Sequence, residues 1–189
     1  MKKSSLVGTT VIYGGSFNPP HIGHQMACLY LLEALGAEAI WVVPARRHPF
    51  GKSLTDFNHR VAMCRILAQP FDGRVEVSRV EEDADLSGRT YDTLVHLTRE
   101  HADRRLAFAV GSDILGETRT WHRWSDIEAL VPVIVIRRAG CVGEGDGLVT
   151  LPEVSSSDIR RRIAERLVIE GLVPLGVADY IASHSLYRQ

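Results

Sequence analysis

Two histidines, His21 and His24, lie three residues apart, after a glycine pair and a proline pair. At this spacing both imidazoles share one face of the first turn of a helix. The start of a helix presents free N–H groups and a positive partial charge. Gly14 and Gly15 would let a ligand approach bare backbone. Together these features indicate a site for an anionic group, most simply a phosphate.

Other chemistry fits this segment less well. No G-x-G-x-x-G dinucleotide fingerprint follows the strand. The run from Gly51 to Ser53 is no Walker loop, because Arg46 stands where the first glycine is required. Two histidines without a third nearby ligand make a weak zinc site. Surface histidines at a helix start are the plainest alternative, but the whole string of glycines, prolines and histidines after a strand favours a phosphate site.

A second candidate anion site lies in a run of serines ending in an arginine. Ser155 and Asp158 have the spacing of a capping box, which predicts a helix start. The hydroxyls of Ser156 and Ser157 and the exposed amides of that start could bind an anion. The planar fork of Arg160 suits phosphate oxygens.

The elements that position these residues alternate along the chain. The sequence predicts short, apolar strands at residues 10–13, 39–43, 74–77, 106–110, 133–136 and, more weakly, 148–151. It predicts helices at residues 22–35, 56–68, 90–100, 156–169 and 177–187. Such alternation favours right-handed βαβ units and an α/β, Rossmann-like, doubly wound parallel sheet of five to six strands. We expect a single domain over residues 1–189, with its ligand at the carboxyl ends of the strands.

Composition narrows the partners. The 189 residues carry a formal charge of −1, which argues against a chain-wide nucleic-acid surface. Three scattered cysteines indicate reduced thiols rather than a disulfide framework. No signal peptide is recognised, and no apolar run reaches the roughly 18 residues that span a bilayer. We therefore expect a cytoplasmic protein without a membrane or nucleic-acid partner. The glycine-rich residues 140–147 are interpreted as a flexible connection.

The order of the motifs carries a family resemblance. Residues 13–24 resemble the signature of the nucleotidylyltransferase superfamily, whose members carry H-x-G-H after the first strand. Residues 154–160 are similar to the I-S-S-T-x-I-R motif of the nicotinate- and nicotinamide-mononucleotide adenylyltransferases. Residues 90–94, 108–124 and 174–187 resemble that family's T-x-D-T-L, G-x-D with W-x-x-W, and V-P-x-x-V-x-x-Y-I segments. The resemblance spans nearly the whole chain and is closest to the bacterial nicotinate-nucleotide enzymes.

The resemblance implies a nucleotidylyltransferase-type fold and an enzyme of NAD biosynthesis. It would join ATP and nicotinate mononucleotide to give deamido-NAD and pyrophosphate. Magnesium would arrive with the ATP phosphates, and no metal ligand is expected from the protein. Several alternatives stay open: a preference for nicotinamide mononucleotide or dual specificity, transfer to phosphopantetheine, cytidylyl transfer, a non-catalytic nucleotide-binding protein, and an RNA-binding fragment. A homo-oligomer is also compatible with the sequence.

The resemblance also assigns residues to roles. The residues expected to bind ATP are Gly14, Gly15, Ser16, Phe17, His21, His24, Gly111, Asp113, Ser156, Ser157 and Arg160. Those expected to carry catalysis are His21, His24, Lys52 and Arg160. Those expected to bind the mononucleotide are Asn18, Lys52, Thr90 and Trp121, with the indole stacked on the pyridine ring. Because a helix start lowers a nearby histidine's pKa, we expect His24 to donate to the α-phosphate as a neutral imidazole.

The chain departs from the family pattern at four positions. Asn18 replaces an aspartate and Ser16 a threonine, and Arg89 stands where an aromatic residue is usual. Lys52 is one place out of register with the family's acceptor loop, which residues 44–52 match only roughly. These departures concern mainly the acceptor side, so they bear on the choice between nicotinate and nicotinamide mononucleotide.

Overall fold

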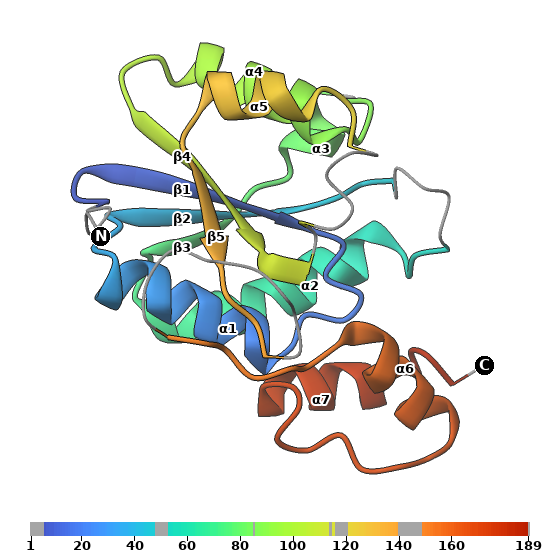
Figure 1. Ribbon diagram of the computed structural model, residues 1–189. Helices are drawn as coiled ribbons and strands as arrows, with labels where there is room; N and C mark the ends of the chain where they lie inside the picture. The colour runs from blue at the N-terminus through green and yellow to red at the C-terminus, as the bar shows by residue number, and fades with distance from the viewer. Residues whose placement is uncertain are drawn as a thin grey trace.

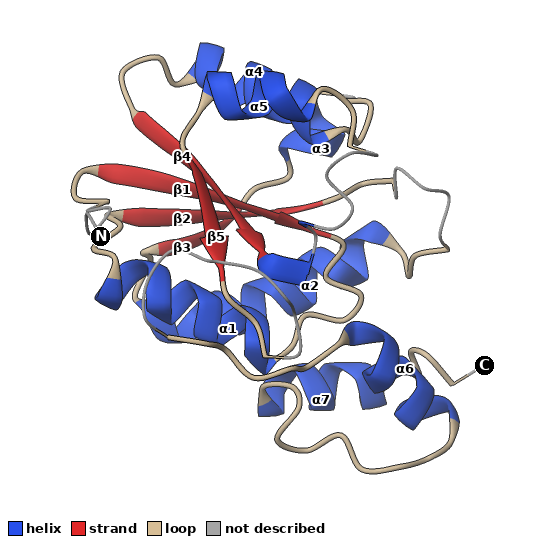
Figure 2. Ribbon diagram, viewed as in Figure 1, coloured by secondary structure: helices blue, strands red, loops and turns tan. Residues whose placement is uncertain are grey.

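A five-stranded parallel sheet forms the centre of the computed structural model (Figure 2), which describes residues 6–47, 53–84, 86–113, 115, 121–139 and 149–188. The strands are β1 (Thr9–Gly15), β2 (Ala39–Pro44), β3 (Val75–Val77), β4 (Arg105–Gly111) and β5 (Val133–Ile136). Their order is β3-β2-β1-β4-β5, and every neighbouring pair is parallel. The chain thus builds outward from β1 in one direction and then in the other, which confirms the doubly wound α/β fold. The point of reversal, between β1 and β4, is where such sheets bind ligands.

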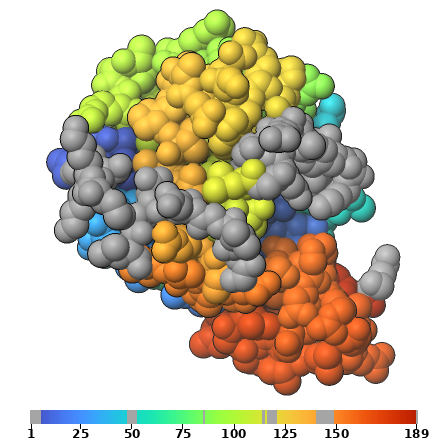
Figure 3. Space-filling model, in the orientation of Figure 1, coloured from blue at the N-terminus to red at the C-terminus, as the bar shows by residue number. Residues whose placement is uncertain are grey.

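Helices cover both faces of the sheet (Figure 1). They are α1 (Ile22–Leu29), α2 (Phe57–Ala68), α3 (Val80–Asp83), α4 (Thr90–Glu100), α5 (Trp124–Leu130), α6 (Ser156–Ala164) and α7 (Leu175–Ser183). Helices α1 and α2 lie on one face and α3, α4 and α5 on the other. Helices α6 and α7 pack below α2 and stand out as a lobe in the space-filling view (Figure 3). No helix in the described ranges is long and apolar enough to cross a membrane.

The core follows the two-residue period of the strands. Val11 and Tyr13 of β1 join the cluster under α1 and α2, whereas Ile12 between them joins the cluster under α4 and α5. A third cluster centres on Met63 of α2 and holds α6 and α7 against it. The first two clusters pack the helices against the two faces of the sheet. The third brings the serine motif, residues 154–160, toward the carboxyl ends of the strands.

Several predicted boundaries are wrong. The helix predicted at 22–35 ends at Leu29 and continues as a π-helix, Tyr30–Ala34, closed by a bond from the Leu35 amide to the Tyr30 carbonyl (3.2 Å). This wider turn keeps Leu31 and Leu32 buried. Apolar spacing could not distinguish it from an α-helical turn.

The helices at the C-terminal end also differ from expectation. Helix α6 ends at Ala164 rather than near 169, because Arg166 adopts a left-handed φ of 57°. Helix α7 covers Leu175–Ser183 rather than 177–187, and Ser185 and Tyr187 likewise have positive φ. The weakly predicted strand at 148–151 is reduced, in its described part, to a single bridge between Leu151 and Arg138. The two short helices α3 and α5 were not predicted. Residues 140–147 lie outside the described part, and the single-domain assignment stays a prediction.

Candidate active site

The candidate site lies where β1 and β4 end side by side. Gly111 closes β4, and an added Cβ there would lie 2.2 Å from Oδ1 of Asp113 and 2.8 Å from Nε of Arg138. Only glycine leaves room for these two charged side chains, which form an ion pair of 3.2 Å. The chain leaves β1 at Gly15 and turns directly into α1. The predicted glycines, Asp113 and residues 14–24, here called the histidine turn, therefore meet at the carboxyl ends of β1 and β4.

His21 and His24 form a stacked pair at the start of α1, with ring centroids 3.6 Å apart and an interplanar angle of 25°. His21 is the N-cap residue, and its backbone N–H donates to Nδ1 of His24 (3.1 Å). Since Nδ1 of His24 accepts, the proton of the neutral ring is on Nε2. His21 is only 2% exposed, and its Nδ1 has no hydrogen-bond partner among the described residues. The pair therefore offers one oriented N–H donor and one buried, unused ring nitrogen.

Burial keeps both rings neutral. It lowers the pKa of His21 to about 3, with a smaller contribution from the positive charge of Arg138. The pKa of His24 is also well below its usual value, first through burial, then through His21 and Arg138. The neutral form agrees with the sequence-based expectation, but burial is the main cause rather than the helix start.

The buried ring of Phe17 packs against the histidine pair. Its ring is 2% exposed and meets the ring of His24 edge-on, with centroids 4.9 Å apart. A Cβ on Gly15 would approach Cζ of Phe17 to 3.1 Å. The ring of Phe17 therefore packs between Gly15 and His24, and its predicted place in the nucleotide crevice stays a prediction.

The serine motif reaches the histidine turn through two hydrogen bonds, and a third bond orients Arg160 within the motif. Ser156 Oγ donates to the Pro19 carbonyl (2.8 Å). Arg160 donates from Nη1 to the Asn18 carbonyl (2.6 Å) and from Nη2 to Ser157 Oγ (3.2 Å). Residues about 140 positions apart in the sequence are therefore brought together. Whether they hold phosphate stays a prediction.

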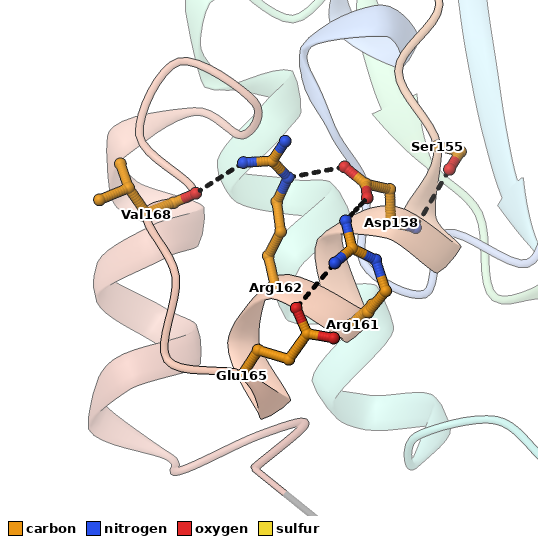
Figure 4. A network of polar contacts seen from close by, with 6 residues as sticks. All are labelled: Ser155, Asp158, Arg161, Arg162, Glu165 and Val168. Atoms are coloured by element: carbon orange, nitrogen blue, oxygen red, sulfur yellow. Dashed lines mark hydrogen bonds and ion pairs between the residues drawn. The ribbon is translucent and has the colours of Figure 1, made fainter.

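Only half of the predicted capping box forms. Ser155 Oγ accepts from the Asp158 amide (3.1 Å), but the carboxylate of Asp158 turns to Arg161 (2.5 Å) and Arg162 (2.7 Å), as Figure 4 shows. Hydrogen bonds from Arg162 and Arg161 lower the pKa of Asp158. Arg161 also pairs with Glu165 (2.7 Å). Of three successive arginines, two are thus engaged with carboxylates along their own helix, and Arg160 faces the turn.

Asn18 holds two distant segments together. It is 3% exposed, and its Oδ1 accepts from Tyr187 Oη (2.9 Å) and from the Thr55 amide (3.3 Å). A cavity of about 390 Å³ opens beside it, between Arg160 and the C-terminal residues. This geometry gives Asn18 a positioning role, and its predicted contact with a mononucleotide stays a prediction. Tyr187 was missed because its part in the site depends on how the chain end folds back.

The predicted acceptor residues are less concentrated. Thr90 begins α4 and is half-buried. Trp121, also half-buried, packs at the edge of the core, with its ring 5.5 Å from that of Trp124 and 6.3 Å from that of Phe108. Lys52 lies outside the described residues. The acceptor side is therefore assembled from separate segments.

Two arginines of the site were not predicted. Arg138 follows β5 and lies against Gly111, held by Asp113 and by a bond from its amide to Ser112 Oγ (3.0 Å). Arg60 of α2 is 1% exposed and donates to the Ser16 carbonyl (2.9 Å). No local sequence signal marks either residue, because strand pairing and helix packing bring them to the site.

The chain resembles known proteins over most of its length. The Cytidylyltransferase-like family model matches residues 12–162. A probable nicotinate-nucleotide adenylyltransferase from Anaeromyxobacter sp. (strain K) is 44% identical over 180 residues, covering 94% of this chain and 95% of that protein. Another, from Myxococcus xanthus (strain DK1622), is 42% identical over 176 residues, with 93% of each chain covered.

The fold has solved counterparts. The structure of Plasmodium falciparum nicotinic acid mononucleotide adenylyltransferase complexed with NaAD aligns with a TM-score of 0.82. That alignment covers 95% of this chain and 97% of the other at 24% identity, and so speaks to the fold. The sequence relatives go further and confirm the resemblance found in the motifs: the chain is a nucleotidyltransferase that belongs to the nicotinate-nucleotide adenylyltransferase family.

Proposed function

We propose that this protein transfers the adenylyl group of ATP to nicotinate mononucleotide, releasing pyrophosphate and forming deamido-NAD. One observation carries the proposal: two stacked, neutral histidines at the switch point of the sheet present an oriented Nε2–H beside the serine–arginine motif. The names of the bacterial relatives support the choice of acceptor.

In this reaction a phosphate oxygen of the mononucleotide attacks the α-phosphorus of ATP. A new oxygen–phosphorus bond forms, and the bond from the α-phosphorus to the pyrophosphate oxygen breaks. The attacking oxygen is already ionised near pH 7 and needs no general base. Catalysis then consists of positioning and charge stabilisation. His24 donates from Nε2 to an α-phosphate oxygen, a contact typically worth about 3 kcal/mol in the transition state.

The remaining contacts divide between the two substrates. Arg160, Ser156 and Ser157, with Lys52, balance the charge of the leaving pyrophosphate. The glycine turn holds the nucleotide through Gly14, Gly15, Ser16, Phe17 and His21. Gly111 and Asp113 hold the adenosine. Thr90, Trp121 and Asn18 hold the mononucleotide, with the indole of Trp121 on the pyridine ring.

Magnesium carried in with ATP would neutralise part of the phosphate charge. The described residues hold no group of three or more His, Cys, Asp or Glu side chains suited to a metal. In the proposal the cation is held by the phosphate oxygens of ATP. The protein's own contribution is to orient the phosphates around the cation.

A cytoplasmic location and a homo-oligomer remain part of the proposal.

The test is an assay with ATP, magnesium and one acceptor at a time, following pyrophosphate and the dinucleotide product. Nicotinate mononucleotide, nicotinamide mononucleotide and phosphopantetheine are compared at equal concentration. The proposal requires the highest kcat/KM with nicotinate mononucleotide. Pyrophosphate release only with phosphopantetheine, or no release with any of the three acceptors, rejects the proposal. A preference for nicotinamide mononucleotide changes the acceptor but keeps the proposed reaction.

A further inference from the structure

Two buried charged side chains form hydrogen bonds with the same short stretch of backbone beside the site. Arg60 of α2 is 1% exposed and Glu81 of α3 is 5% exposed. The stretch that they share is Ala45–Arg46, directly after β2. It begins the segment that the sequence assigns to the acceptor.

Arg60 uses its guanidinium only on backbone carbonyls in the bonds that the structure describes. Nη1 donates to Ser16 (2.9 Å) and to Ala45 (2.7 Å), and Nε donates to Thr55 (2.9 Å). Nη2 donates to Arg46 (3.4 Å). One rigid fork therefore joins the histidine turn, the start of the acceptor segment and the chain leading into α2.

Glu81 holds the same stretch from the amide side. Its Oε2 accepts from the Arg46 amide (2.8 Å), and its Oε1 accepts from Thr93 Oγ1 of α4 (3.0 Å). Burial raises the pKa of Glu81, and these two bonds and the charge of Arg60 oppose that rise. The carboxylate thus connects the acceptor segment to the helix that begins at Thr90.

Burying two charges is a costly way to gain stability, because an apolar pair of similar volume is often as good or better. What these two charged side chains add is hydrogen bonding of fixed direction to the backbone. A guanidinium presents donors in a fixed plane, and a carboxylate accepts at two oxygens. Together they fix the carbonyls of Ala45 and Arg46 and the amide of Arg46, whereas the Ala45 amide is bonded to the Gly15 carbonyl (2.8 Å).

We propose that Arg60 and Glu81 are positioning residues that set the distance between the acceptor segment and the histidine turn. Arg60 reaches both sides at once, through Ser16 and Ala45. In-line attack needs the acceptor oxygen close to the α-phosphorus, and a misplacement of about 1 Å costs about a hundredfold in rate. The inference rests on the proposed adenylyl transfer.

The test compares Arg60→Lys, Arg60→Met and Glu81→Gln, with Arg65→Met on the exposed side of α2 as the matched control. Folding is checked by circular dichroism and thermal melting. Binding of a non-hydrolysable ATP analogue is measured by calorimetry, separately from kcat and from the KM of the acceptor.

We expect folded Arg60→Lys to bind the ATP analogue nearly as wild type does, while kcat falls by about a hundredfold and the acceptor KM rises. Arg60→Met should lose at least as much, Glu81→Gln should raise mainly the acceptor KM, and Arg65→Met should match wild type. A purely structural role would lower the melting temperature without separating the two substrates.

Wild-type kcat and acceptor KM in folded Arg60→Lys would overturn the inference. If neither Arg60 variant folds, Glu81→Gln decides, and an unchanged acceptor KM there overturns it. Failure of the proposed function is distinguishable, because it shows in the wild-type acceptor assay. The variants are then measured with whichever acceptor the wild type uses.

Discussion

The two halves of the candidate site are built in different ways. The predicted nucleotide half centres on one continuous stretch, residues 14–24, which runs from the end of β1 into the start of α1. The His21–His24 pair is oriented by a bond within that stretch. Gly111 and Asp113 at the end of β4 and the serine motif of α6 complete this half from elsewhere in the chain. The predicted acceptor half draws on the end of β2, the start of α4 and Trp121. Arg60 and Glu81 hold the end of β2, and Glu81 also joins it to α4.

This difference teaches where each half is sensitive. In the nucleotide half the side chains themselves would touch the phosphates, so their loss should lower kcat or weaken ATP binding. In the acceptor half, buried side chains that would not touch the substrate hold the backbone of Ala45 and Arg46. Changes to those side chains should raise the acceptor KM and disturb the alignment of the acceptor with ATP.

The largest effect is expected for His24→Ala. Loss of the oriented Nε2–H should lower kcat by at least about a hundredfold with the fold retained. Steady-state turnover and circular dichroism measure the two parts. His184→Ala is the control and should keep wild-type turnover, because His184 is exposed at the end of α7 and its ring contacts His59 of α2. An unchanged kcat in His24→Ala would remove His24 from the mechanism.

His21→Asn tests how much the free energy of unfolding depends on pH because His21 is buried in its neutral form. The folded pKa of His21 is about 3 and the unfolded value about 6.5. Between these values the unfolded chain binds more protons, so stability is full above pH 6.5 and falls on acidification. The contribution is up to about 1.4 kcal/mol for each pH unit. Asparagine keeps a good N-cap without that titration.

Urea unfolding between pH 7.5 and 5 measures this contribution. The free energy of unfolding should fall less steeply with acidification in His21→Asn than in wild type. Parallel curves for the two proteins would contradict the buried, neutral state of His21.

Gly111→Ala should act on ATP alone. The new Cβ would overlap Oδ1 of Asp113 and crowd Arg138, so both side chains must move. We expect the KM of ATP to rise about tenfold, equivalent to roughly 1.4 kcal/mol of binding. The acceptor KM, measured in the same preparation, should stay at its wild-type value, and an equal rise in both would place Gly111 outside the adenosine side.

The smallest effect is expected for Trp121→Ala. Loss of a stacked indole is worth on the order of 1 kcal/mol, or about fivefold in the KM of the mononucleotide. Trp121→Phe keeps a flat aromatic face and should recover most of the affinity. Equal changes in the KM values of ATP and the mononucleotide would refute the stacking role and leave Trp121 as part of the core.

Much of this molecule could be predicted from local patterns. The strand and helix alternation predicted the parallel sheet, and the spacing of His21 and His24 predicted a shared face at a helix start. The serine run predicted the Ser155 cap. These predictions succeeded because each depends on residues within a turn or two of one another, where backbone geometry alone sets the arrangement.

The sequence by itself determined the family, the sheet and the histidine turn. Only the tertiary structure decided that Arg138 lies against Gly111, that Tyr187 bonds to Asn18, and that Arg60 and Glu81 hold one stretch of backbone between them. The physical reason is that a buried charge acquires its role from whichever carbonyl or amide packs beside it. Those partners come from distant segments, and their meeting is a property of the whole fold.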